Sequence, residues 1–129
     1  MIYVDTSVVL SHVLAEDVRP SADFWSGQEH VASRLTEYEA WVRLHGYGKG
    51  ATHGRTLAMT LATLHLLELD DAVCARCRAP WPVPIRTLDA LHLATVDFLS
   101  HQGLTVEVAT YDSRMRDAAM AMGFALAAL

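Results

Sequence analysis

The fold is decided by the stretch Ile2-Tyr3-Val4-Asp5-Thr6-Ser7-Val8-Val9-Leu10. It opens with a run of β-forming residues without alternation, which is the pattern of a strand covered on both faces. The run stops at Asp5 and two hydroxyl residues, and apolar positions then resume at helical spacing. We therefore expect Asp5 at the point where a first, central strand gives way to a helix. Ligand sites of open parallel sheets lie just beyond the carboxyl ends of the strands, so a carboxylate here suggests a metal ion.

The composition is that of a globular protein: of 129 residues, 52% are hydrophobic and 19% are charged. No linker or repeat interrupts the chain, which predicts a single domain over residues 1–129. No apolar run approaches the ~20 residues of a membrane span. The first apolar run follows no basic segment and is broken by Asp5, which argues against a signal peptide. We expect a cytoplasmic protein that does not enter a membrane.

The charge of the chain is acidic, with a formal net value of -5. Passive nucleic-acid binders usually carry a basic surface, so this balance argues against that class of protein. It leaves open an enzyme whose acidic residues hold metal ions. The two cysteines, Cys74 and Cys77, lack the second pair that a zinc site needs. They fall within a helical pattern, and we interpret them as core thiols.

Strand and helix patterns alternate along the chain. We expect short strands near 30–32 and at 105–110 and 124–129, and helices at 20–25, 33–44, 87–102 and 113–122, with a helical stripe over 56–67. In the 33–44 helix, the expected core stripe consists of Leu35, Tyr38, Trp41 and Val42, with Glu39 on the same face. The alternation predicts an α/β fold, a three-layer sandwich with a central, mostly parallel sheet.

Four carboxylates stand out by their positions, namely Asp5, Glu39, Asp89 and Asp112. Each has a simple structural explanation: Asp89 suits a helix N-terminus, Asp112 suits an N-cap, and Glu39 pairs with Arg43 one turn on. Together, however, four converging carboxylates repel one another unless some bind protons or a counter-ion is present. Mg²⁺ takes oxygen ligands and keeps several waters, so it resolves this repulsion with few direct carboxylates.

Four motifs in order resemble the signatures of PIN-domain ribonucleases. They are Asp5-Thr6-Ser7 after the first strand, Leu35-Thr36-Glu37-Tyr38-Glu39, Leu88-Asp89-Ala90-Leu91-His92-Leu93-Ala94, and Thr110-Tyr111-Asp112 with Gly123 downstream. The small size of the chain is similar to that of the VapC toxins of toxin–antitoxin pairs. The resemblance implies cleavage of RNA that depends on Mg²⁺ or Mn²⁺, a homodimer, and inhibition by a small antitoxin protein.

The same resemblance assigns roles to residues. It makes Asp5, Glu39, Asp89 and Asp112 the catalytic quartet, with Asp5, Asp89 and Asp112 as metal ligands, and Thr6 and Ser7 as groups that orient ligands or water. Glu37 competes with Glu39, which we prefer because it follows Thr36 by three residues. Arg114 is the candidate for phosphate contact, together with Arg86 and Arg116, which also flank the proposed site in sequence, although solvated helix ends remain an alternative. We interpret His92 as a core or supporting imidazole and not as a general base.

Two other functions remain open. A phosphohydrolase of the haloacid-dehalogenase type also begins with a strand that ends in a nucleophilic Asp, but it requires a second Asp where Ser7 stands. A PIN-like protein that binds a partner and is catalytically weak is the other alternative. The complete quartet argues against it, because a binding scaffold has no use for four crowded carboxylates.

Overall fold

The computed structural model describes residues 1–129 and has a parallel five-stranded sheet at its centre. The strand order is β3-β2-β1-β4-β5, so the first strand is central as expected. The strands are β1 (Ile2–Val4), β2 (His30–Ser33), β3 (His65–Leu67), β4 (Glu107–Ala109) and β5 (Ala125–Leu126). The predicted α/β class with a central parallel sheet is confirmed.

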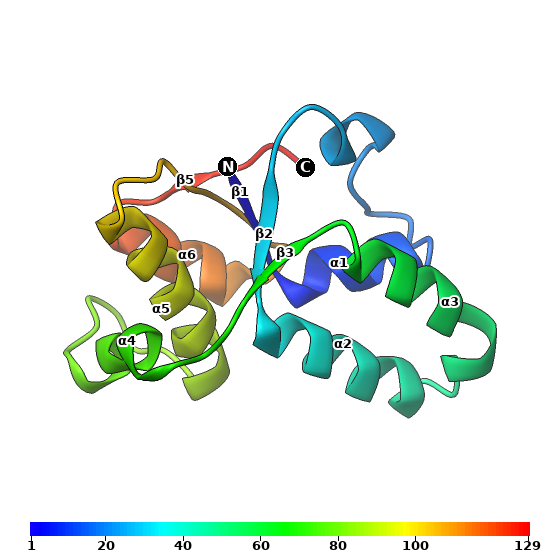
Figure 1. Ribbon diagram of the computed structural model, residues 1–129, viewed down its shortest axis with the longest axis horizontal. Helices are drawn as coiled ribbons and strands as arrows, with labels where there is room; N and C mark the ends of the chain where they lie inside the picture. Colours follow the sequence, from blue (N-terminus) through cyan, green and yellow to red (C-terminus); the bar gives the residue numbers. More distant parts are fainter.

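Helices cover both faces of the sheet and form the two outer layers, which lie on opposite sides of the strands in Figure 1. One layer holds α1 (Thr6–Val13), α2 (Arg34–Gly46) and α3 (Gly50–Leu61), which contact one another. The other layer holds α4 (Asp71–Cys74), α5 (Thr87–His101) and α6 (Ser113–Ala121), with α5 packed between its neighbours. Short 3₁₀ turns, η1 (Ala22–Trp25) and η2 (Ala75–Arg78), complete the chain. None of these helices has the length and apolar character needed to span a lipid bilayer.

Strand β1 joins two separate hydrophobic cores. Successive strand residues point to opposite faces of a sheet, so the side chains of Ile2 and Val4 enter the core of the α1–α3 layer. Tyr3 enters the core of the α5–α6 layer instead. All three residues are buried, which is the burial that the apolar run at the start of the chain predicts.

The inward face of α2 differs from the expected one. Tyr38 and Val42 are 60% and 71% exposed, whereas the buried positions are Thr36, Ala40 and Leu44. Small side chains let the helix pack closely against its neighbours, and the larger apolar residues are left on the outer face. The expected inward placement of Glu39 is nevertheless correct, since its side chain is 10% exposed.

Three further expectations need correction. Helix α3 ends at Leu61, so Leu64 and Leu67, placed on one helical stripe with Leu61, lie in a loop and in β3. The closing strand has two residues instead of six, and both cysteines are free and half-buried instead of fully buried.

Candidate functional site

Each of the four carboxylates is placed by a helix: α1, α2 and α6 begin just beyond the carboxyl ends of β1, β2 and β4, whereas α5 follows a loop. Asp5 follows β1 and is the N-cap of α1, and Asp112 is the N-cap of α6 and accepts hydrogen bonds from the backbone N–H groups of Arg114 and Met115. Asp89 lies in the first turn of α5. Because β1 and β4 are paired neighbours, the helices that follow them start at the same edge of the sheet. The capping role expected as the simple explanation of Asp112 therefore coexists with a place at this edge.

The two oxygens of Asp5 have different surroundings. Oδ2 accepts hydrogen bonds from Ser7 N at 3.2 Å, from Ser7 Oγ at 2.6 Å and from Thr110 Oγ1 at 2.9 Å. Oδ1 accepts none, and the nitrogen recorded nearest to it is His92 Nε2 at 3.7 Å. The carboxylate is therefore fixed through one oxygen, and the other is left free to bind a further group.

Glu39 repeats this asymmetry. Its Oε2 accepts hydrogen bonds from Thr6 Oγ1 and His92 Nε2, the latter at 2.8 Å. Its Oε1 is 3.8 Å from Arg43 Nη2, the ion pair expected from the sequence. Burial raises the pKa of Glu39, but the hydrogen bonds from His92 and Thr6 and the charges of His92 and Arg43 outweigh burial, so this pKa is lowered. Glu39 is therefore held ionised.

His92 connects this carboxylate with the sheet. Its side chain is 2% exposed, and its Nδ1 lies 2.7 Å from the Tyr3 hydroxyl, whose oxygen also accepts a hydrogen bond from Ser33 N at 3.3 Å. Burial lowers the pKa of His92, but the hydrogen bond to Glu39 and the charges of Asp5, Glu39 and Asp89 outweigh burial and raise this pKa. The expectation of a supporting imidazole agrees with this geometry.

One pocket gathers most of the predicted site residues. It is lined by Glu39, Asp89 and Asp112 together with Arg43, Arg86, Thr87, Leu88 and Arg114. Burial raises the pKa of Asp89, and the charges of Asp112, Asp5 and Glu39 raise it further. These four carboxylates, which we call the acidic quartet, thus act on one another electrostatically although they come from four different helices. Glu37 lies elsewhere, since it pairs with Arg34 at 2.8 Å, and Glu39 is the member that the geometry favours.

Comparison with known proteins shows the family of the chain. The PIN domain family matches residues 2–120. The chain belongs to the PIN-domain family. It is 35% identical to Ribonuclease VapC46 of Mycobacterium tuberculosis over 130 residues, covering 98% of this chain and 96% of that protein. Ribonuclease VapC35 of the same species is 29% identical over 99% of this chain and 96% of its own length. These relatives make the chain a VapC-type PIN domain.

A solved structure supports the fold of this PIN domain. The Toxin-antitoxin complex from Klebsiella pneumoniae superimposes with a TM-score of 0.54 and covers 88% of both chains at 20% sequence identity. At this identity the match bears on the fold alone. It agrees with the three-layer architecture described above.

The donor set of this PIN domain suits a hard divalent cation. No three His, Cys, Asp or Glu side chains are grouped as a ready-made set of ligands. Mg²⁺ does not need such a set, because it keeps several waters and binds proteins through one or two carboxylates. The pocket supplies only carboxylate oxygens as anionic donors, and Asp5 leaves its Oδ1 without a hydrogen bond. The residues therefore fit Mg²⁺ or Mn²⁺ by chemistry.

Sequence reasoning missed two supporting residues of the site. Thr110 donates to Asp5 Oδ2 and accepts from Asp112 N at 3.1 Å, so it links two members of the acidic quartet. Tyr3 reads as a β-forming core residue, yet its hydroxyl holds His92. The signals for Thr110 are its position directly after the strand that pairs with β1 and its place in the motif Thr110-Tyr111-Asp112, which gave it no role of its own. Nothing in the sequence indicates the role of Tyr3.

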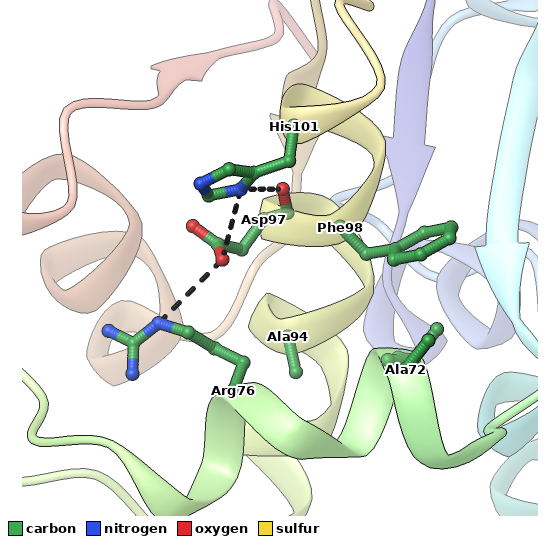
Figure 2. Close-up of a pocket in the computed structure, with 7 residues that line it drawn as sticks. Ala72, Arg76, Ala94, Asp97, Phe98 and His101 are labelled. Atoms are coloured by element: carbon green, nitrogen blue, oxygen red, sulfur yellow. Dashed lines mark hydrogen bonds and ion pairs between the residues drawn. The ribbon is translucent and has the colours of Figure 1, made fainter.

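A second charged pocket lies at the other end of α5 (Figure 2). There Asp97 Oδ2 is 3.7 Å from Arg76 Nε and 3.4 Å from His101 Nδ1, and the Arg76 guanidinium stacks 4.1 Å above the Trp81 ring. His101 Nδ1 also lies 2.8 Å from the Asp97 carbonyl oxygen. The charges of Arg76 and Asp97 compensate one another, and we interpret the cluster as a contact that holds η2 against α5.

Proposed function

We propose that this VapC-type PIN domain is an endoribonuclease that depends on Mg²⁺ or Mn²⁺ and acts as the toxin of a toxin–antitoxin pair. The observation that carries the proposal is the acidic quartet, whose members share one electrostatic neighbourhood and raise the pKa of Asp89. The names of the relatives, Ribonuclease VapC46 and VapC35, support RNA as the substrate class.

In this proposal, Asp5, Asp89 and Asp112 hold the cation. The bound cation supplies a Lewis acid that neutralises a phosphodiester and makes water more acidic. The chain's own groups prepare the pocket: Thr6 fixes Glu39, and Ser7 fixes Asp5, which refines their expected role in orienting ligands or water. Because its pKa is lowered, Glu39 stays ionised and orients water as a hydrogen-bond acceptor, with Oε1 as its less engaged oxygen.

Arginines at the pocket are the proposed phosphate contacts. Arg86 and Arg114 line the pocket beside Asp89, and neither forms an ion pair. A free guanidinium offers a planar fork that matches the oxygens of a phosphate group. This supports two of the three arginines that the sequence suggests as phosphate contacts, Arg114 and Arg86. Arg116, the third candidate from the sequence, does not line the pocket.

The proposed partners follow from the relatives. The Klebsiella protein was solved as a toxin–antitoxin complex, and the mycobacterial relatives are named as VapC ribonucleases. We propose a small cognate antitoxin for this chain on that ground, and we propose a homodimer and a cytoplasmic location from the sequence analysis alone. Co-expression with the protein encoded beside it, followed by copurification and sizing by light scattering, tests the complex and the dimer.

An RNA cleavage assay tests the activity. The purified protein is incubated with total RNA in the presence of Mg²⁺, in EDTA, and as the variant Asp5→Asn, with Asp23→Asn in the exposed turn η1 as the matched control. We expect cleavage by the wild type and by Asp23→Asn with Mg²⁺, and none in EDTA or by Asp5→Asn. Cleavage that survives both EDTA and Asp5→Asn contradicts the proposal. Phosphate release from small phosphomonoesters without RNA cleavage would favour the dehalogenase-type alternative.

A further inference from the structure

We infer that His92 is a positioning residue of the acidic quartet: its Nε2–H group fixes Oε2 of Glu39 and sets the spacing between Glu39 and Asp5. The inference rests on the proposed function, because it assigns His92 a role in the same pocket. Its basis is a chain of hydrogen bonds that starts at β2, passes through β1 and α5, and ends at α2.

The direction of these hydrogen bonds is set by the partners. An ionised carboxylate only accepts, so the contact of 2.8 Å between His92 Nε2 and Glu39 Oε2 requires a proton on Nε2. On the other side of the ring, Nδ1 lies 2.7 Å from the Tyr3 hydroxyl, which is itself held by Ser33 N. Both nitrogens are therefore engaged, and the ring has one orientation that satisfies them together.

Because the ring is buried, water cannot easily take over the hydrogen bonds that the imidazole makes. His92 and Tyr3 are 2% and 0% exposed, and their rings meet edge to face at 73°. Without the imidazole, Oε2 of Glu39 keeps only the hydrogen bond from Thr6. Glu39 would then be held by one hydrogen bond instead of two, and the ion pair of its Oε1 with Arg43, which is 47% exposed at 3.8 Å, adds little restraint.

One nitrogen of His92 lies near the carboxylates of both Glu39 and Asp5. His92 Nε2 is 2.8 Å from Glu39 Oε2 and 3.7 Å from Asp5 Oδ1, the oxygen that is not hydrogen-bonded. Since His92 comes from α5 and Glu39 from α2, the imidazole also bridges the two helical layers at the edge of the sheet. His92 thus fixes the position of Glu39, in one helical layer, relative to the pocket residues Asp89 and Asp112 of the other layer.

Steady-state kinetics on RNA separate positioning from mere packing. In His92→Leu the ring's volume is largely kept but the donor is lost, and we expect kcat to fall about 10- to 100-fold with KM within about 2-fold. In His92→Gln an amide N–H replaces the imidazole donor, and we expect kcat to recover by about 5-fold or more over His92→Leu. The matched control is His101→Leu on the same helix, which should leave both constants unchanged. Equal kcat values in folded His92→Leu and wild type would overturn the inference.

A second measurement does not depend on activity. Nitrogen-15 NMR of the histidine-labelled protein should show His92 with its proton on Nε2. A proton on Nδ1 alone would overturn the inference even if the enzyme is active. If His92→Leu fails to fold, Tyr3→Phe takes its place in the kinetics, and an unchanged kcat in that variant together with an Nδ1 proton counts against the inference. Failure of the wild type to cleave RNA contradicts the proposed function instead, while the NMR result still decides the hydrogen bond.

Discussion

Helix α5 carries an aspartate and a histidine near each of its ends, and the two pairs behave differently. At its start, Asp89 lines the pocket of the acidic quartet, and the buried imidazole of His92 lies against the carboxylates of Glu39 and Asp5. At its end, Asp97 is a single carboxylate between Arg76 and His101, and the His101 side chain is 75% exposed (Figure 2). The first cluster has an excess of negative charge and the second is balanced. The difference shows that an aspartate and a histidine one turn apart do not by themselves indicate a functional site. Uncompensated negative charge at the edge of the sheet is the better indicator.

The largest effect should come from the same substitution made at both ends of α5. Asp89→Asn should reduce the rate of RNA cleavage about a thousandfold, because a member of the acidic quartet is lost. Asp97→Asn should leave the rate unchanged, since Asp97 lies outside the pocket. Cleavage of a labelled RNA under single-turnover conditions measures both. Similar losses in the two variants would break the distinction between the clusters.

The two histidines should also differ in what they contribute to stability. His92→Leu should lower the free energy of unfolding by about 3 kcal/mol, because it leaves the nearly buried Glu39 without its partner. His101→Leu should lower it by less than about 0.5 kcal/mol, as expected of an exposed pair one turn apart. Urea unfolding followed by tryptophan fluorescence gives both values. A loss below about 1 kcal/mol in His92→Leu would mean that the buried pair is no stronger than the surface pair.

The pH dependence sharpens the comparison further. The pKa of His92 is raised from 6.5, so the stability contributed by its cationic form is fully present below pH 6.5 and is lost as the pH rises through the raised value. The pKa of Glu39 is lowered from 4.5, so its contribution is present above pH 4.5 and is lost as the pH falls through the lowered value.

The free-energy difference between wild type and His92→Gln should therefore be largest between pH 4.5 and pH 6.5 and should shrink as the pH rises toward 9. Unfolding curves at a series of pH values measure it, and His101→Gln is the control. A difference that grows with rising pH would contradict the assigned direction of the His92 shift.

The smallest expected effect is the change in stability when Asp89 loses its charge, in the absence and in the presence of the cation. Burial and the neighbouring carboxylates raise the pKa of Asp89, so its charge is unfavourable in the metal-free protein. Asp89→Asn should therefore stabilise the metal-free protein by about 0.5 kcal/mol, the size of the repulsion within a like-charge pair one helical turn apart, although it slows RNA cleavage. Added Mg²⁺ should raise the melting temperature of the wild type and have less effect on the variant. A variant less stable than the wild type in EDTA would show that Asp89 serves mainly the helix N-terminus.

The order of elements and the acidic quartet are predictable from the sequence because the signals are local. The apolar run before Asp5 predicts a buried strand, and the residues after it predict the start of a helix. The same kind of signal places Asp112 at the start of α6. Since parallel strands present their carboxyl ends at one edge, local patterns suffice to bring these carboxylates into one region.

The contacts that hold the quartet are not predictable in the same way. Pairing of Val4 with Ala109 places Thr110 beside Asp5, and this register depends on how β1 and β4 meet. The helical period also failed for α2, where Thr36 and Ala40 face inward in place of Tyr38 and Val42. Large apolar residues dominate a sequence pattern, but close packing of a helix on its neighbours selects small ones.

Strand β1 has three residues, and like its neighbours β2 and β4 it contributes side chains to both hydrophobic cores. Asp5 and Glu39 precede or belong to helices of one core, whereas Asp89 and Asp112 belong to the start of helices of the other. A small rotation between the halves would therefore change distances across the pocket while each half keeps its own packing. In the proposed function, the rate of cleavage therefore depends on how the shared sheet aligns the two helical layers.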